Sequence, residues 1–286
     1  MTSLTSMAQY GIIKIEVREL KDDKYLELRR KTVTKANDLI QKSRFNLSLQ
    51  QQKIVLYLIS QITSTDEDFK LYEFSIAEFC RVCGIDDNNG KTYQDLKTGI
   101  KEIADKSLWV AIDERRETLL RWIEKPYIDA GSGVIRIRLD SDMKPFLLQL
   151  KQNFTSYEIL WTLHFKSKYT VRLYELVKSI HFHDLDYFQK RYSVDELKRL
   201  LGGDRYKQYR DFKRRVLVPS VKEINQYSDK SVVFEEIKRG RKVMGIEFNV
   251  TSKDSMEAAK IRSDIEKEMG FDQLTLWDKL EDKGFA

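Results

Sequence analysis

The chain has 286 residues, 41% of them hydrophobic and 34% charged, so it is long enough to bury one large core or two ordinary ones beneath a charged surface. No stretch approaches the roughly 18 apolar residues of a membrane span, and residues 1–21 lack the apolar core of a signal peptide. Two cysteines, Cys80 and Cys83, provide no disulfide framework and favour a reducing cytoplasm.

The first half of the chain predicts helices followed by strands. A capping box at Ser75 and Glu78 opens a short helix that Gly84 ends, because glycine readily adopts the left-handed conformation of a helix terminus. Apolar periodicity and turn residues predict the other elements. These are a helix or edge element over 33–40, a helix after Ser48, a strand over 69–74, a helix over 92–105, and strands over 108–112, 118–128 and 134–139.

The second half predicts the same order of elements. Ser193 and Glu196 form another capping box, and Gly202-Gly203 ends its short helix. The remaining predictions are a helix over 169–180, a long basic helix from about 205 to 226, and strands over 232–237 and 243–250.

The two halves also repeat one sequence pattern. Residues 74–84 match 192–202 in residue class, and 93–97 match 209–213 in the same order. A helix, a short helix, a turn, a long helix and a hairpin make the winged-helix variant of helix-turn-helix. The predicted fold class is therefore α+β, with two tandem winged-helix domains related by internal duplication. Generic α+β packing is the alternative, but it would not need a capping box at the same place twice.

Positive charge is concentrated in the second half. The net charge is +6, yet residues 205–242 carry 12 Lys/Arg against 5 Asp/Glu, whereas residues 253–286 carry 6 against 9. A basic segment of this kind favours an anionic partner, and nucleic acid is the first candidate.

The long basic helix separates two kinds of side chain. At about 100° per residue, Tyr209, Phe212 and Val216 share one face, which should pack inward. The opposite face and its flanks are cationic, and such a helix suits the major groove of duplex DNA. We expect Arg210 and Arg214 to read bases there, and the remaining cations to hold phosphates. Those phosphate ligands are Lys207, Lys213 and Arg215.

A solvated helix surface is the alternative interpretation of these cations, with Asp211 pairing Lys207 or Arg215 at helical spacing. Further along the helix, near Pro219, the apolar residues move to a different face from that of Tyr209. A proline inside a helix removes a backbone hydrogen bond and kinks the axis.

Four cations cluster at the turn of the last predicted hairpin, around Gly240. They have no structural reason to gather there, so we interpret the hairpin as a wing that grips DNA. The cations are Lys238, Arg239, Arg241 and Lys242.

The corresponding helix of the first half presents a milder, mixed surface that includes Asp95 and Glu102. It predicts weak accessory DNA contact or protein association. The accessory residues are Lys91, Gln94, Lys97, Thr98 and Lys101.

Enzymatic signatures are weak. The triplet His181-Phe182-His183, with Tyr187 or Tyr192 as nucleophile, is similar to the metal motif of rolling-circle nucleases, but alternate residues of a helix point apart. Cys80 and Cys83 lack a second pair for structural zinc. Neither a Walker-type glycine loop nor a Ser/His/Asp constellation occurs. We therefore predict a protein without catalytic activity, cofactor or metal.

The chain resembles the iteron-binding plasmid replication initiators that have two winged-helix domains. The likeness covers about residues 34–250 and rests on residues 35–40, the Ser75 segment, residues 209–216 and 221–225, and the cationic hairpin. The resemblance implies that monomers bind direct repeats of an origin, mainly through the second domain. It also implies origin melting, recruitment of a host initiator and helicase, and dimers joined through the first domain that repress their own gene.

These expectations divide the chain into four parts. Residues 1–33 form an extension, 34–150 a first winged-helix domain for dimerisation and accessory DNA contact, 151–252 the main DNA-binding domain, and 253–286 a charged tail that is helical or mobile. A DNA-associated protein of the bacterial cytoplasm is expected. A winged-helix transcriptional repressor remains the first alternative function, and a rolling-circle nickase the second.

Overall fold

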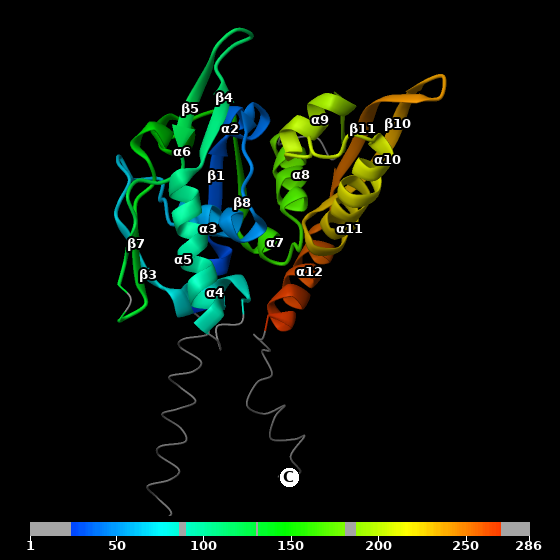
Figure 1. The fold of residues 1–286 in the computed structure, drawn as a ribbon. Coiled ribbons are helices and arrows are strands. Elements are labelled where there is room, and N and C mark those ends of the chain that lie inside the picture. The colour runs from blue at the N-terminus through cyan, green and yellow to red at the C-terminus, as the bar shows by residue number, and fades with distance from the viewer. Residues whose placement is uncertain (1–23, 86–89, 130, 181–186, 270–286) are drawn as a thin grey trace, which may run out of the picture.

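The computed structural model describes residues 24–85, 90–129, 131–180 and 187–269, and places two halves side by side (Figure 1). Residues 24–30 are helical. The elements of the first half are β1 (Thr32–Ala36), α2 (Asn37–Gln41), β2 (Ser43–Arg44), α3 (Leu49–Ser60), β3 (Tyr72–Ser75), α4 (Ile76–Cys83), α5 (Gly90–Asp105), β4 (Ser107–Ala111), β5 (Glu117–Arg121), β6 (Tyr127–Ile128), β7 (Val134–Ile137), η1 (Ser141–Met143), α6 (Lys144–Leu147) and β8 (Phe154–Glu158).

The second half follows with α7 and repeats the helix, strand, short helix, long helix and hairpin order. Its elements are α7 (Leu160–Leu163), α8 (Lys168–Ser179), β9 (Tyr187–Ser193), α9 (Val194–Leu201), α10 (Tyr209–Phe212), the π turn η2 (Lys213–Leu217), α11 (Val218–Tyr227), β10 (Lys230–Arg239), β11 (Lys242–Ser252) and α12 (Ser255–Glu268). None of the described helices is long and apolar enough to cross a bilayer.

The two short helices end in the same way but begin differently. Gly84 and Gly202 have φ of 62° and 67°, so both helices end in the left-handed conformation as predicted. At Ser193 both halves of the capping box form. At Ser75 only the serine half forms, because the Glu78 carboxylate accepts a hydrogen bond from Tyr57 (2.8 Å) instead of turning back to the helix start. The hydrogen bond from the Ser75 backbone to the Glu78 side chain does not form, so this part of the predicted capping box is wrong.

The two halves use their strands differently. In the second half β9 joins β11, and β11 joins β10, in an antiparallel sheet whose β10–β11 hairpin is the predicted wing. In the first half the hairpin is β4–β5. The strand before the short helix, β3, does not join this hairpin, as β9 joins the wing, but pairs with β7. The single strand expected over 118–128 is two strands, β5 and β6, and the sequence did not predict β9.

The junction of the halves is built from segments distant in the sequence. The element expected over 33–40 is a strand followed by a helix, and the strand, β1, pairs antiparallel with β8 from Thr32↔Glu158 to Ala36↔Phe154. β8 follows residue 150 in the sequence but pairs with β1, so in space it belongs with the first half. The domain boundary after residue 150 stays a prediction.

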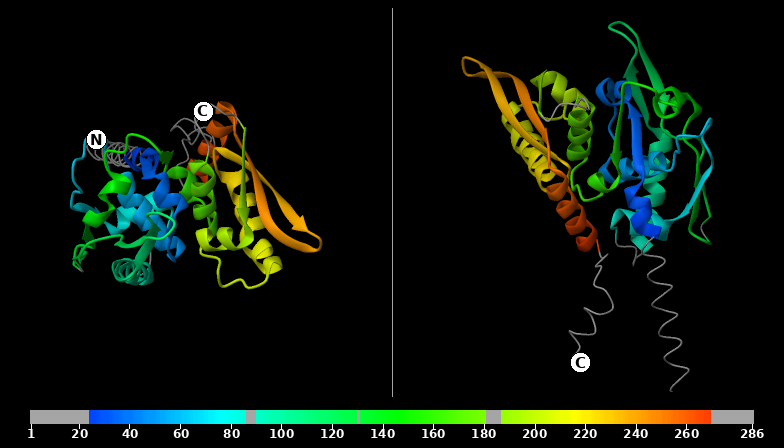
Figure 2. Two further views of the ribbon diagram at one scale, coloured as in Figure 1. Left: turned by 90° about the horizontal axis from the view of Figure 1, so that it is seen from above. Right: turned by 180° about the vertical axis from the view of Figure 1, so that it is seen from behind.

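Helix α12 returns from the end of the second half to the first half (Figures 1 and 2). Asp254 caps its start, Arg262 lies 2.7 Å from Glu158 at the end of β8, and Glu266 lies 3.2 Å from Arg30. The start of the tail after Ser252 is therefore helical and is attached to both halves.

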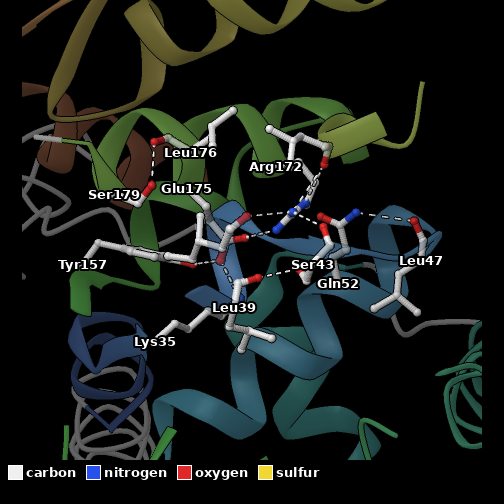
Figure 3. A network of polar contacts seen from close by, with 12 residues as sticks. Lys35, Leu39, Ser43, Leu47, Gln52, Tyr157, Arg172, Glu175, Leu176 and Ser179 are labelled. Carbon is white, nitrogen blue, oxygen red and sulfur yellow. Dashed lines mark hydrogen bonds and ion pairs between the residues drawn. The ribbon is translucent and has the colours of Figure 1, made fainter. Parts of the chain in front are cut away.

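A buried polar network lies beneath this junction (Figure 3). The Glu175 carboxylate of α8 is 2.5 Å from Lys35 Nζ of β1 and accepts a hydrogen bond from Tyr157 Oη of β8 at 2.6 Å. Its second oxygen lies 3.3 Å from Arg172, whose guanidinium also donates to the carbonyls of Ile40 (3.2 Å) and Leu200 (3.3 Å). Burial alone would raise the pKa of Glu175, but the charges of Lys35 and Arg172 hold it below its usual value.

Candidate nucleic-acid interface

The long basic helix of the second half runs from Tyr209 to Tyr227 through α10, the π turn and α11. Phe212 and Val216 are fully buried and Tyr209 is half-buried against the core, which confirms the inward stripe. The helix start expected near residue 205 is wrong. Lys207 lies in the loop before the helix, with its side chain exposed and its carbonyl accepting a hydrogen bond from Lys198 at 3.1 Å.

The arginines of this helix lie on its outer face. Arg210, Arg214 and Arg215 are exposed, and Arg214 lies 3.2 Å from Asp211. Within the described ranges, the side chains of Arg210 and Arg215 form no ion pair, so Asp211 does not neutralise Arg215. Guanidinium groups one helical turn apart can donate to guanine edges and phosphates of a major groove. Base contact by Arg210 and Arg214 remains a prediction.

Lys213 turns away from this face toward the wing. Its Nζ is 2.7 Å from the carboxylate of Glu236 on β10, which also accepts a hydrogen bond from Tyr209 Oη at 2.8 Å. Glu236 is not among the residues predicted from the sequence, because the pattern of a strand does not reveal which helix its side chains meet. The acidic pair Glu235-Glu236 beside a four-cation turn was the available signal, and it does not distinguish the two glutamates.

A π turn separates the two parts of the long helix. Val218 donates its backbone N–H to the carbonyl of Lys213, five residues back, and Pro219 follows immediately. The proline has no N–H for the ordinary bond to residue 215. The predicted change of apolar phase near Pro219 therefore arises in a wide turn, which directs Val216, Leu217 and Ile224 into the core.

The wing presents its cations at its tip, where Gly240 has a φ of 62° and a Cβ atom at this position would meet no other atom within 4 Å. Lys238 lies 3.1 Å from the second oxygen of Glu236. The side chains of the other three cations are exposed, and they form no ion pair in the part of the chain that the structure describes. These three are Arg239, Arg241 and Lys242.

The first half offers a weaker counterpart. Leu96, Ile100 and Ile103 of α5 are at most 1% exposed, so the opposite face of this helix lies in solvent. All five predicted accessory residues are exposed there; they are Lys91, Gln94, Lys97, Thr98 and Lys101.

The two helices that carry the predicted contacts lie on the same side of the molecule. Seen from above, α5 and α10 lie along one edge, one in each half, and both hairpins extend beyond the body at the same end (Figures 1 and 2). One straight ligand could therefore approach both halves from this side.

Among the described residues, those that could suggest other chemistry are not assembled into a site. His181 and His183 lie outside the described residues, and the described part of the chain contains no cluster of three potential metal ligands. Tyr192 is 6% exposed, and burial raises its pKa well above the ordinary value. Cys80 and Cys83 are buried, and burial raises the pKa of Cys83 to about 12, so its reactive thiolate form is disfavoured.

Two helix-turn-helix units, each followed by a β-hairpin, define a protein of the two-domain winged-helix class. The family described as "Initiator Replication protein, WH1" matches residues 32–178, and the one described as "Initiator Rep protein, WH2" matches residues 193–250. The chain belongs to this family of plasmid replication initiators, whose members are DNA-binding proteins with winged-helix domains and not a family of enzymes.

One relative and one solved structure are similar to this chain. A "Replication initiation protein" of Escherichia coli is 26% identical over 228 residues, which are 76% of this chain and 69% of that protein. The crystal structure of the Pi initiator protein, in complex with iteron DNA, superimposes with a TM-score of 0.65 at 18% identity. That match covers 79% of this chain and 99% of the Pi chain, and it supports the fold.

Proposed function

We propose that this protein binds duplex DNA sequence-specifically, mainly through residues 151–252, and initiates plasmid replication by binding direct repeats in an origin. One observation carries the proposal: Arg210 and Arg215 are exposed without ion-pair partners in the described ranges, beside a hairpin tip that holds Arg239, Arg241 and Lys242. Uncompensated cations on a helix and a wing are suited to a major groove and its flanking phosphates. The Pi initiator, which has the same fold, was crystallised with iteron DNA.

The first half has accessory roles in this proposal. Its helix α5 contacts DNA beside the main site, and residues 34–150 join two copies when the protein represses its own gene. The bound protein helps to melt the origin and recruits the host initiator and helicase in the bacterial cytoplasm. It acts by binding alone, without cofactor, metal or catalysis.

Footprinting on the DNA that surrounds its own gene tests the proposal. Protection of several evenly spaced direct repeats supports an initiator. A single protected palindrome at the promoter, with no repeats, would instead favour a transcriptional repressor, which uses the same groove chemistry but does not open an origin.

A second experiment tests the assignment as a protein without catalysis. Supercoiled DNA is incubated with the protein and a divalent metal, and the products are separated on a gel. Intact supercoils are expected. Metal-dependent nicking by the wild type that disappears in His181→Ala would establish a rolling-circle nickase instead.

A further inference from the structure

Glu236 is the acidic centre of the cationic surface. It lies on β10, where the wing leaves the body, and 17% of its side chain is exposed. One carboxylate oxygen accepts from Tyr209 Oη (2.8 Å) and Lys213 Nζ (2.7 Å), and the other lies 3.1 Å from Lys238 Nζ. These three donors come from the first turn of α10, the start of the π turn, and the wing.

We infer that Glu236 is a positioning residue for DNA recognition, which fixes the recognition helix to the wing and withholds two lysines from phosphates so that binding depends on sequence. The inference rests on the proposed function and names a residue that sets its specificity. Glu236 itself is expected to touch no DNA.

The geometry explains the first part of this role. Tyr209 and Lys213 are four residues apart and lie on one side of the helix, so a single carboxylate holds both ends of its first turn. Lys213 Nζ also lies 5.9 Å from the centre of the Phe234 ring on the same strand. The helix and the wing are thereby held in one orientation, and the exposed Arg210 keeps a fixed position relative to the tip.

The charges explain the second part. The hydrogen bond from Lys213 is the main cause that lowers the pKa of Glu236 to about 2, so the carboxylate is ionised at neutral pH. Phosphate contacts give affinity for any sequence, and each cation that neutralises a phosphate adds about 0.9 to the salt slope of binding. Lys213 and Lys238 already share the single negative charge of Glu236, which weakens the attraction of both to phosphates, so more of the affinity comes from groups that the geometry directs to the groove.

The test compares Glu236→Gln with Glu235→Gln. Gln keeps the shape and an acceptor for Tyr209 but removes the charge. Glu235 is an exposed neighbour on the same strand, its side chain alternates to the other face, and it has no ion pair within the described residues. Both variants change the net charge equally, so their difference isolates the contacts of Glu236. Circular dichroism and urea unfolding establish that each variant is folded.

Binding is measured on the footprinted site and on a scrambled duplex at several salt concentrations. We expect Glu236→Gln to bind the scrambled duplex about 3- to 10-fold more tightly at low salt, with a salt slope steeper by roughly 1. Its ratio of specific to non-specific affinity should fall, whereas Glu235→Gln should keep the wild-type ratio. Equal behaviour of the two variants would overturn the role of Glu236 and leave the proposed function intact.

A second comparison gives a result even if Glu236→Gln does not fold. Lys213→Gln should reduce affinity for the scrambled duplex less than Arg215→Gln, because Lys213 is already paired and Arg215 is not. Equal losses would show that Glu236 does not withhold Lys213. A wild-type protein that binds no duplex at all would refute the proposed function, and this role with it.

Discussion

Lys35 and Glu175 are 140 residues apart in the chain, yet the ammonium nitrogen of the one lies 2.5 Å from the carboxylate of the other. Both side chains are at most 4% exposed. Moving two charges out of water is costly, and the pair is stable here because Tyr157 and Arg172 supply further hydrogen bonds to the same carboxylate. The pair connects the first strand of the first half with the first long helix of the second.

Removing this carboxylate should severely destabilise the protein. In Glu175→Ala, the charges of Lys35 and Arg172 remain buried without their main partner, and we expect a loss of about 3–5 kcal/mol in the free energy of unfolding. Urea denaturation measures it. Asp38→Ala, which breaks an exposed pair with Lys42, should change stability by no more than about 1 kcal/mol. A similar small loss in Glu175→Ala would contradict the interpretation of the network.

Two substitutions should separate base reading from phosphate binding. Arg210→Ala is expected to lose about 1–3 kcal/mol of binding free energy on the footprinted site and to relax base preference at one position. Lys242→Ala should weaken binding to all DNA sequences alike and reduce the salt slope of binding by about 1. Competition binding with single-base variants of the site measures both effects. If Arg210→Ala weakens every sequence equally, Arg210 is a phosphate contact.

Lys230 should make stability depend on pH. Burial, and then repulsion from Lys178, lowers its pKa to about 8 despite the nearby carboxylate of Asp229. In the unfolded chain Lys230 has an ordinary lysine pKa of about 10.4. Between about pH 8 and 10 the unfolded chain therefore holds this proton more often than the folded protein, so the free energy of unfolding rises with pH over this range.

The variant Lys230→Met tests this dependence. It removes a buried charge but also a 2.7 Å hydrogen bond to Ser252, and we expect a net gain of about 1–2 kcal/mol at pH 7. Urea denaturation at pH 7 and pH 9.5 should show that the gain shrinks at the higher pH. An equal difference from the wild type at both pH values would show that Lys230 titrates normally.

Two glycines should respond to alanine with opposite signs. At Gly99, in the middle of α5, an added Cβ meets its nearest atoms at 3.6 Å and beyond. Gly99→Ala should therefore raise the free energy of unfolding by about 0.5–1 kcal/mol, because alanine loses less backbone entropy than glycine when the helix forms. At Gly203 the same atom would lie 2.8 Å from the ring of the fully buried Phe212, so Gly203→Ala should cost about 1–3 kcal/mol.

Thermal unfolding of the two glycine variants measures both effects. Because Phe212 anchors the recognition helix, Gly203→Ala should also weaken DNA binding at temperatures where it remains folded. A stabilised Gly203→Ala would show that the ring moves freely and that the helix is not held by this contact.

Local rules predicted much of the fold. Ser193, Gly84 and Gly202 act at helix ends through their own backbone geometry, which depends only on near neighbours. The inward position of Phe212 likewise follows from helical periodicity. At Ser75 the glutamate part of the predicted capping box does not form for a non-local reason, because Tyr57 and Lys24 reach the Glu78 carboxylate from other elements.

The unpredicted features depend on contacts between distant segments. Nothing near Glu236 in the sequence indicates that Tyr209 and Lys213 would meet it, and Arg262 does not reveal its partner Glu158, 104 residues earlier. The exposure of the predicted DNA-binding cations could be anticipated from the helix face. The division of these cations into free groups and groups already paired with a carboxylate could not be anticipated.

The Glu175 network also limits how the two halves can be recombined. A chimera that joins this first half to the second half of a relative would bring Lys35 and Tyr157 to a helix that must offer a carboxylate at the position of Glu175 and a guanidinium at that of Arg172. Transplanting a DNA specificity between such proteins is therefore better done by exchanging the segment from α9 to β11, which keeps all four side chains and requires the new α9 only to supply the carbonyl that Arg172 meets at Leu200.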